Sequence, residues 1–254
     1  MAELTRIMII KEVYAKSILS ESKVSDYTIN PYVGCEHGCT YCYARFVKRF
    51  TGHKEGWGEF VDIKVNAATL LKHEVNRKRV GRVWISGLCD PYQPLEKRYG
   101  ITRSCLEILL KNGWPITIQT KSTLVQRDIE LLRNRKNVEV TLTITTADEE
   151  IKRIFEPKAP SIRERIETLE KLHSVGIKTC VMIAPLLPGA EGLVDEISGK
   201  VDRVLIDRMN YHYADWVYRK HGLEQAMSEE FFEEKKLGIA NALRKRGIAC
   251  ELLF

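Results

Sequence analysis

The sequence predicts an α/β fold, and more specifically a partial (βα)6 barrel of parallel strands. Short β-branched apolar runs alternate with helix-period stretches nearly to the end of the chain, a pattern typical of a parallel sheet with right-handed crossovers. Six or seven such units fit a closed or partly closed barrel, with an open doubly wound sheet as the alternative. No Gly-rich dinucleotide turn follows the first strand, and the loop there carries cysteines instead.

The expected elements alternate in chain order. We expect strands at 24–32, 60–65, 82–86, 115–120, 138–145, 177–186, 203–208 and 248–254. Helical patterns cover 40–50, 67–77, 102–112, 124–135, 161–174 and 228–246. The helix at 161–174 has the clearest signals, with Ser161 as the N-cap, Ile162 and Leu169 on one apolar face, and Gly176 just past its end.

Length and composition indicate one globular domain over 1–254, with a core at about 25–210 and a C-terminal extension at 211–254 that holds helices and a short closing strand. The chain is 44% hydrophobic and 29% charged, which is ordinary for a globular protein. No apolar run approaches the roughly 18 residues of a membrane span, and the first residues lack the pattern of a signal peptide. We therefore expect no membrane partner and a cytoplasmic location.

The net charge of +6 is spread over short basic clusters at 45–50, 77–82 and 244–246. Such clusters are usually solvated faces, but a basic groove can also bind a phosphate-bearing partner. Charge alone leaves a nucleic-acid partner open.

Three cysteines, Cys35, Cys39 and Cys42, follow the first expected strand with the spacing Cys-x-x-x-Cys-x-x-Cys. In a reducing compartment this cluster indicates metal binding rather than disulfides. Structural zinc needs four closed ligands. His37 or His53 could be the fourth, but neither completes a familiar zinc spacing. A [4Fe–4S] cluster offers each iron to one thiolate, so three cysteines would leave one iron open to a small molecule.

This motif, with an aromatic residue before its last cysteine, resembles the signature of the radical S-adenosylmethionine (SAM) enzymes. The stretches "NPYVGCEHGCTYCYAR", "DPYQPLE", "QTKSTLVQRDIELL" and "FEPKAPSIRERIETLEKLHSVGI" further resemble the spore photoproduct lyase-related subfamily over about residues 25–190. The resemblance implies a partial barrel, a [4Fe–4S] cluster and reductive cleavage of SAM to a 5′-deoxyadenosyl radical that abstracts hydrogen from a substrate. It also implies a one-electron reductant such as a ferredoxin or flavodoxin.

Residue roles follow from the same resemblance. Cys35, Cys39 and Cys42 would ligate the cluster, and Tyr41 would lie near the adenine, although it could simply be a packing aromatic. Lys121 would reach the cofactor carboxylate, unless it is a solvated surface lysine. Four hydroxyls at strand ends would face the methionine and ribose of the cofactor, although threonine is also a common strand residue. These are Ser86, Ser122, Thr143 and Thr145.

Cys89 departs from the family pattern. The lyase carries a hydrogen-donating cysteine in a Ser-Cys-Thr-Ser-Asp stretch, whereas this chain has "SGLCD", with Gly87 in the position of that cysteine. A thiol two residues later can still donate hydrogen to a carbon radical, and Cys89 can equally be an incidental small residue. This departure puts photoproduct repair itself in doubt.

Candidate substrate contacts lie on two further loops. Asp90, Tyr92 and Gln93 belong to the "DPYQP" loop, which a Pro-bracketed turn would also explain. Tyr211 and His212 begin a polar-aromatic cluster after the last barrel strand, where stacking on a nucleobase and packing of a closing helix are both possible. The stretch "RMNYHYADWVYRKHGLEQAMSEEFFEEKK" has no match to the family.

The sequence thus predicts a radical SAM enzyme whose substrate is a nucleic-acid base or, alternatively, a peptide or small metabolite. A zinc-stabilised nucleic-acid-binding module and a simple electron-transfer iron–sulfur protein remain as rivals from other classes.

Overall fold

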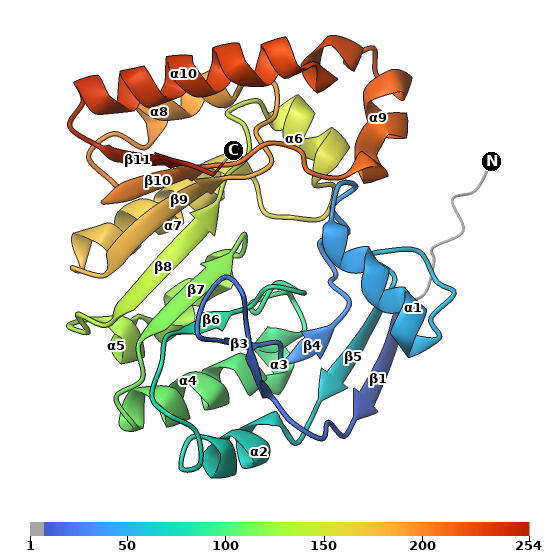
Figure 1. Cartoon of the computed structure of the whole chain (residues 1–254), viewed down its shortest axis with the longest axis vertical. Helices are drawn as coiled ribbons and strands as arrows, with labels where there is room; N and C mark the ends of the chain where they lie inside the picture. Colours follow the sequence, from blue (N-terminus) through green and yellow to red (C-terminus); the bar gives the residue numbers. More distant parts are fainter. Residues whose placement is uncertain (1–7, 254) are drawn as a thin grey trace.

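The computed structural model describes residues 8–253, and its largest element is a curved sheet of eight strands. Six consecutive strands of this sheet, β3 and β6–β10, pair in parallel, β11 extends one edge in parallel, and β2 pairs antiparallel at the other edge. In spatial order the strands are β11 (Ala249–Leu252), β10 (Arg203–Ile206), β9 (Lys178–Ile183), β8 (Val138–Thr143), β7 (Ile116–Thr120), β6 (Val83–Ile85), β3 (Tyr27–Ile29) and β2 (Leu19–Glu21). The α/β partial barrel predicted from the sequence is confirmed (Figure 1).

One predicted barrel strand lies elsewhere. The stretch 60–65 forms β5 (Phe60–Lys64), which pairs with β1 (Ile9–Val13) and β4 (Tyr32–Val33) in a separate three-stranded sheet. The predicted strand 24–32 divides into β3 and β4 at Pro31, which has no N–H to donate to a ladder. The carbonyl oxygen of Pro31 instead accepts a hydrogen bond from Lys64 N at 3.1 Å. The barrel therefore begins at β3 and passes directly to β6.

The helices lie mainly along the outside of the sheet (Figure 1). Those expected from the sequence are α2 (Ala67–Glu74), α4 (Ile101–Lys111), α5 (Ile129–Leu132), α7 (Ile162–Ser174) and α10 (Glu229–Lys245). The helical patterns at 40–50 and 124–135 are each partly 3₁₀, as η1 (Tyr43–Val47) followed by α1 (Lys48–Thr51), and as η2 (Thr123–Asp128) followed by α5. Short helices that were not predicted are α3 (Glu96–Tyr99), α6 (Glu149–Phe155), η3 (Ala190–Gly192), α8 (Leu193–Glu196), η4 (His212–Ala214), α9 (Asp215–Lys220) and η5 (Glu224–Met227).

Helix α7 begins with the predicted cap. The Ser161 side chain accepts a hydrogen bond from Glu164 N, and the Glu164 carboxylate accepts one from Ser161 N, which is a complete capping box. Gly176, two residues after the helix ends, has a φ of 76° that favours glycine. This firm start fixes Arg165 in the first turn of α7.

Two of the apolar clusters hold the barrel and the cysteine loop together. The larger one fills the space between the strands and helices α4, α7 and α10. A smaller cluster joins the cysteine loop to α6 and α9 through Tyr41, Phe155 and Tyr218. The cysteine loop is thus packed against the C-terminal half of the chain. Within residues 8–253, no helix is long and apolar enough to cross a membrane.

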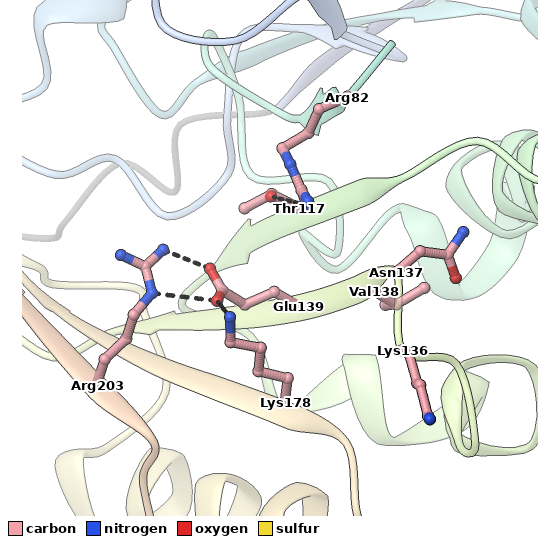
Figure 2. Close-up of a pocket in the computed structure, with 8 residues that line it drawn as sticks. All are labelled: Arg82, Thr117, Lys136, Asn137, Val138, Glu139, Lys178 and Arg203. Atoms are coloured by element: carbon pink, nitrogen blue, oxygen red, sulfur yellow. Dashed lines mark hydrogen bonds and ion pairs between the residues drawn. The ribbon is translucent and has the colours of Figure 1, made fainter. Parts of the chain in front are cut away.

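The amino ends of the barrel strands enclose a cavity of about 240 Å³ (Figure 2). Glu139 on β8 accepts hydrogen bonds there from Arg203 Nε and Nη2 at 3.1 and 2.5 Å, and lies 3.3 Å from Lys178 Nζ. Arg82 donates to the Thr117 hydroxyl at 3.4 Å. This end of the barrel is held by partly solvated ion pairs.

Candidate active site

A larger cavity, of about 390 Å³, opens at the carboxyl ends of the strands. The cysteine loop and the loops after β6, β7, β9 and β10 converge on it, as expected for a parallel barrel. Ten of the predicted site residues line this cavity, namely Cys35, Cys39, Tyr41, Cys42, Ser86, Cys89, Asp90, Lys121, Thr143 and Tyr211.

The three clustered cysteines have free thiols that face this one cavity. Burial raises the pKa of Cys39 to about 12, and burial also raises the pKa of Cys35 and of Cys42. The thiols therefore keep their protons at neutral pH, and any metal that they bind would have to displace those protons.

The donor set fits an iron–sulfur cluster, because three soft thiolates from one loop can each take a separate iron. Within residues 8–253, no three His, Cys, Asp or Glu side chains are grouped so as to hold a single metal ion. The indole N–H of Trp57 also lines the cavity beside Cys42, and its hydrogen bond to that sulfur acts against burial by lowering the pKa of the thiol.

The "DPYQP" loop holds one side of the cysteine loop. Gln93 Oε1 accepts a hydrogen bond from Glu36 N at 2.9 Å, and the Glu36 carboxylate accepts one from Leu95 N at 2.6 Å. His37 Nδ1 lies 3.3 Å from Asp90 Oδ2. These bonds fix the loop directly after Cys35.

Helix α6 and the residues after it hold the other side. Thr40 N donates to Phe155 O at 2.9 Å, and the Tyr41 hydroxyl donates to the Glu156 carboxylate. Lys158 Nζ donates to Gly58 O at 2.9 Å. The cysteine loop is therefore clamped by a segment that lies far away in the sequence.

Gly34, directly before the first cysteine, is required by both conformation and space. Its φ is 89°, and a Cβ at this position would stand 2.3 Å from the carbonyl oxygen of Phe60. Any other residue would have to move β5 or the cysteine loop.

Glu156 is the centre of a buried charge network that the sequence did not predict. Arg165 Nη1 lies 2.6 Å from Glu156 Oε2, and Lys121 Nζ lies 3.8 Å from Glu156 Oε1. Thr145 Oγ1 donates to the same carboxylate at 3.1 Å. Burial alone would raise the pKa of Glu156, but the charges of Arg165 and Lys121 and the hydrogen bond from Tyr41 lower it to about 2.

Lys121 remains a cation at the cavity wall. Burial would lower its pKa, but Cys39 and Glu156 more than offset this, so its pKa is raised. The ammonium group also lies 5.5 Å from the centroid of the Tyr41 ring. The lysine can therefore neutralise an anionic group placed beside the cysteine loop.

Asn30 and Ser86 organise the wall beside Cys89. The Asn30 side-chain oxygen accepts hydrogen bonds from Ser86 Oγ at 2.7 Å and from Leu88 N at 2.7 Å. Ser86 Oγ lies 3.1 Å from Cys89 Sγ. Burial raises the pKa of Cys89 to about 11, so its thiol is neutral at ordinary pH.

Five predicted site residues do not line the cavity. Tyr92 is fully buried and donates its hydroxyl to Asp128 at 2.8 Å, and Gln93 is buried behind the cysteine loop. Ser122 caps η2, Thr145 is bonded to Glu156, and His212 is an exposed residue beside Asp215. Asp90 does reach the cavity, but Thr120 and the backbone N–H of Lys121 occupy its carboxylate. Tyr92, Gln93 and Asp90 thus support loops rather than face a substrate.

Sequence reasoning missed several residues with clear positional signals. Asp207, Arg208, Met209 and Asn210 line the cavity directly after β10, where the position at a strand end was the available signal. Glu156 stands immediately before Pro157, at the end of a short helix that was not expected. Its role depends on contacts with the cysteine loop, which no local pattern indicates.

Comparisons with known proteins agree with this geometry. The family model described as the radical SAM superfamily matches residues 29–191. An uncharacterized protein of Methanocaldococcus jannaschii is 32% identical over 261 residues, which cover 96% of this chain and 96% of that protein. A radical SAM Nalpha-GlyT isomerase of Pseudomonas phage M6 is 26% identical over 161 residues, which cover 63% of this chain and 33% of that protein.

Solved structures share the fold at low identity. Spore photoproduct lyase complexed with dinucleoside spore photoproduct has a TM-score of 0.70 at 14% identity, covering 96% of this chain and 82% of that chain. SuiB of Streptococcus suis bound to S-adenosylmethionine has a TM-score of 0.55 at 14% identity, covering 98% of this chain and 51% of that chain.

Proposed function

This chain belongs to the radical SAM superfamily, and from that premise we propose that it is a radical SAM enzyme that abstracts hydrogen from a nucleic-acid base. The observation that carries the proposal is that three free cysteine thiols and a charged lysine line one cavity at the carboxyl ends of the strands. The fold agrees with that of spore photoproduct lyase.

The cysteine loop would hold a [4Fe–4S] cluster through Cys35, Cys39 and Cys42. When bound, the cluster and SAM together supply one-electron reductive cleavage and a carbon radical, with a ferredoxin or flavodoxin as the electron donor. The protein's own contribution is position and charge. Lys121 would bind the carboxylate of the cofactor, with its charge maintained by Glu156, and Tyr41 would pack beside the adenine.

Hydroxyl groups would orient the rest of the cofactor. Ser86 and Thr143 line the cavity from the ends of β6 and β8. Thr143 would donate a hydrogen bond to the methionine or ribose, whereas Ser86, whose proton is donated to Asn30, would accept one. Ser122 and Thr145 would act only indirectly, because their hydroxyl groups already serve a helix cap and Glu156. We also propose that residues of about 25–210 form the catalytic core and 211–254 its extension.

Cys89 would return hydrogen to the substrate. Because its thiol is neutral and faces the cavity, the S–H bond can break homolytically as a C–H bond forms on the substrate radical. The sulfur radical would then be restored by one electron from the reductant and one proton. A Cys89→Ala variant should still cleave SAM but accumulate products of an unquenched substrate radical.

Support for a nucleic-acid base comes from the lyase, whose structure holds a dinucleoside photoproduct. The aromatic side chains at the cavity mouth are also suited to stacking on a base. Another solved relative, SuiB, is bound to a precursor peptide, so a peptide substrate is the outcome that would redirect the proposal.

The test is anaerobic reconstitution followed by SAM cleavage. We expect brown protein with about four irons per chain, which after reduction by dithionite converts SAM to methionine and 5′-deoxyadenosine. Cys42→Ala should abolish iron uptake, while Cys250→Ala, in β11 and outside the cavity, should not. Colourless protein with one zinc, or a cluster protein that leaves SAM intact, would overturn the proposal in favour of a zinc module or an electron carrier.

A further inference from the structure

A row of five aromatic rings leads from solvent to the mouth of the candidate active site. The row consists of Phe50, Phe46, Tyr43, Tyr211 and Tyr213. Neighbouring ring centroids are 6.4, 6.5, 5.7 and 6.0 Å apart in that order. The three contacts from Phe46 to Tyr213 are nearly parallel, with interplanar angles of 20–22°. We call this set the aromatic row.

The aromatic row joins two distant segments of the chain. Phe50, Phe46 and Tyr43 lie on α1 and η1, while Tyr211 directly precedes η4 and Tyr213 lies in η4, just before α9. Figure 1 shows α9 beside the start of this helical segment. Tyr43 and Tyr211 line the cavity, and Tyr211 is also 50% exposed to solvent. Phe50, at the outer end of the row, is 81% exposed. Phe50 thus presents its ring to solvent at the outer end of a continuous row.

The segment that carries the row is strongly basic. Residues 43–54 contain Arg45, Lys48, Arg49 and Lys54 and no acidic residue. Within residues 8–253, none of these four side chains forms an ion pair with a carboxylate. The Arg45 guanidinium lies 4.9 Å from the centroid of the Tyr213 ring and donates to Thr40 O at 2.5 Å. The row is therefore flanked by positive charge that the protein itself does not neutralise.

Aromatic rings interleaved with unneutralised cations are the combination that binds single-stranded nucleic acid, because bases stack on the rings and phosphates pair with the cations. The ring spacing is nearly twice the roughly 3.4 Å rise per base of a duplex strand, so bases can follow the rings only in an unstacked strand. A peptide would gain little from the cations unless it were acidic.

We propose that the aromatic row is the track on which a single nucleic-acid strand lies while one of its bases enters the cavity. This inference rests on the proposed function and names its substrate as a base within a strand rather than a free nucleotide.

Binding of a fluorescent oligothymidylate of about 12 nucleotides to the reconstituted protein tests the proposal by anisotropy. Phe50→Ser should weaken binding about tenfold, the loss expected from one stacked base. Tyr14→Ser removes a similarly exposed ring, 82% exposed and on a segment outside the row, and should leave binding unchanged. Phe50 lies outside the cavity, so Phe50→Ser should cleave SAM at the normal rate in the absence of substrate.

The salt dependence of oligonucleotide binding separates the contribution of the cations from that of the aromatic rings. Arg49→Gln should reduce the slope of log K against log salt by about 0.7, one phosphate contact on a single strand. Lys136→Gln, at the opposite end of the barrel, should leave the slope unchanged. Equal losses for Phe50→Ser and Tyr14→Ser, tighter binding of a duplex, or preferential binding of an acidic peptide would overturn the proposal.

The two proposals fail in different ways. Protein that binds the strand but does not cleave SAM contradicts the proposed function alone. Protein that cleaves SAM but does not bind the strand even at low salt contradicts the aromatic row alone.

Discussion

The two ends of the barrel each place a glutamate between an arginine and a lysine, but in different surroundings. At the carboxyl end, the Glu156 and Arg165 side chains are 0% exposed and Lys121 is 15% exposed. At the amino end, the Glu139 side chain is 6% exposed, but its partners Arg203 and Lys178 are 32% and 56% exposed.

The difference shows that exposure of the partners, rather than the residue types, decides what such a triad does. Charges attract far more strongly away from water, and they also cannot be rehydrated when a partner is lost. The amino-end triad lies across the amino ends of β8, β9 and β10, and water can still reach its arginine and lysine. The carboxyl-end triad instead keeps a cation and a carboxylate in fixed positions beside the cysteine loop.

The largest expected effect comes from removing the charge of each glutamate in turn. Glu156→Gln leaves Arg165 buried without a counter-charge and should lower the free energy of unfolding by about 3–5 kcal/mol. Glu139→Gln leaves cations that solvent can hydrate and should cost about 1 kcal/mol or less. Urea unfolding followed by circular dichroism measures both.

Equal losses in the free energy of unfolding for Glu156→Gln and Glu139→Gln would show that the two triads do not differ in their dependence on burial. A Glu156→Leu/Arg165→Met double variant is the matched control, because it deletes both buried charges and should recover much of the stability.

Acid should act mainly on the carboxyl end. The pKa of Glu156 in the folded protein, about 2, lies below its ordinary value, so its stabilising contribution is complete above about pH 4.5 and is lost as the pH falls toward 2. This contribution is on the order of 3 kcal/mol. Unfolding free energies measured across that range should fall more steeply for the natural protein than for Glu156→Gln. Parallel pH profiles would contradict the assignment.

Two glycines with similar positive φ angles provide a further comparison. Gly34 and Gly113 have φ of 89° and 73°, but a Cβ on Gly113 would meet nothing within 4 Å. Gly113→Ala should therefore cost only the left-handed strain, about 1 kcal/mol, while Gly34→Ala should cost about 2 kcal/mol or more and also reduce iron uptake. Thermal unfolding and iron content report the two effects separately, and normal iron uptake in Gly34→Ala would show that the cysteine loop adapts.

The smallest effect should come from the most exposed partner. Lys178→Met removes the charge of a side chain that is 56% exposed, and its partner Glu139 keeps Arg203. We therefore expect a loss of about 0.5 kcal/mol or less in the free energy of unfolding. A loss above 2 kcal/mol would mean that the amino-end triad behaves like the buried one.

Much of the fold was predictable because its signals are local. Strand–helix alternation predicted the parallel sheet, and Ser161 with Gly176 predicted α7. Membership of a sheet is not local, so β5 was expected in the barrel although it pairs with β1 and β4. Helices as short as α6 and α9 have too few turns to show a periodic pattern.

The residues of the candidate site also fall into those with a local sequence signal and those that depend on distant contacts. The cysteine spacing and Lys121 at a strand end were visible in the sequence, whereas Glu156 gained its role from a contact with Tyr41 across 115 positions. Tyr92 illustrates the opposite error, because a polar residue on a functional-looking loop is buried once its hydroxyl group finds Asp128.

The clamp between Thr40 and Phe155 has a consequence for how the protein is made. The two residues are 115 positions apart, so at roughly 5–20 residues per second the ribosome releases the cysteines on the order of 10 s before their clamp. Iron delivered to the nascent chain would meet an unfinished pocket with exposed, oxidisable sulfur. If the proposed cluster is held here, a cell would gain from loading iron only after the C-terminal half of the chain has emerged and folded.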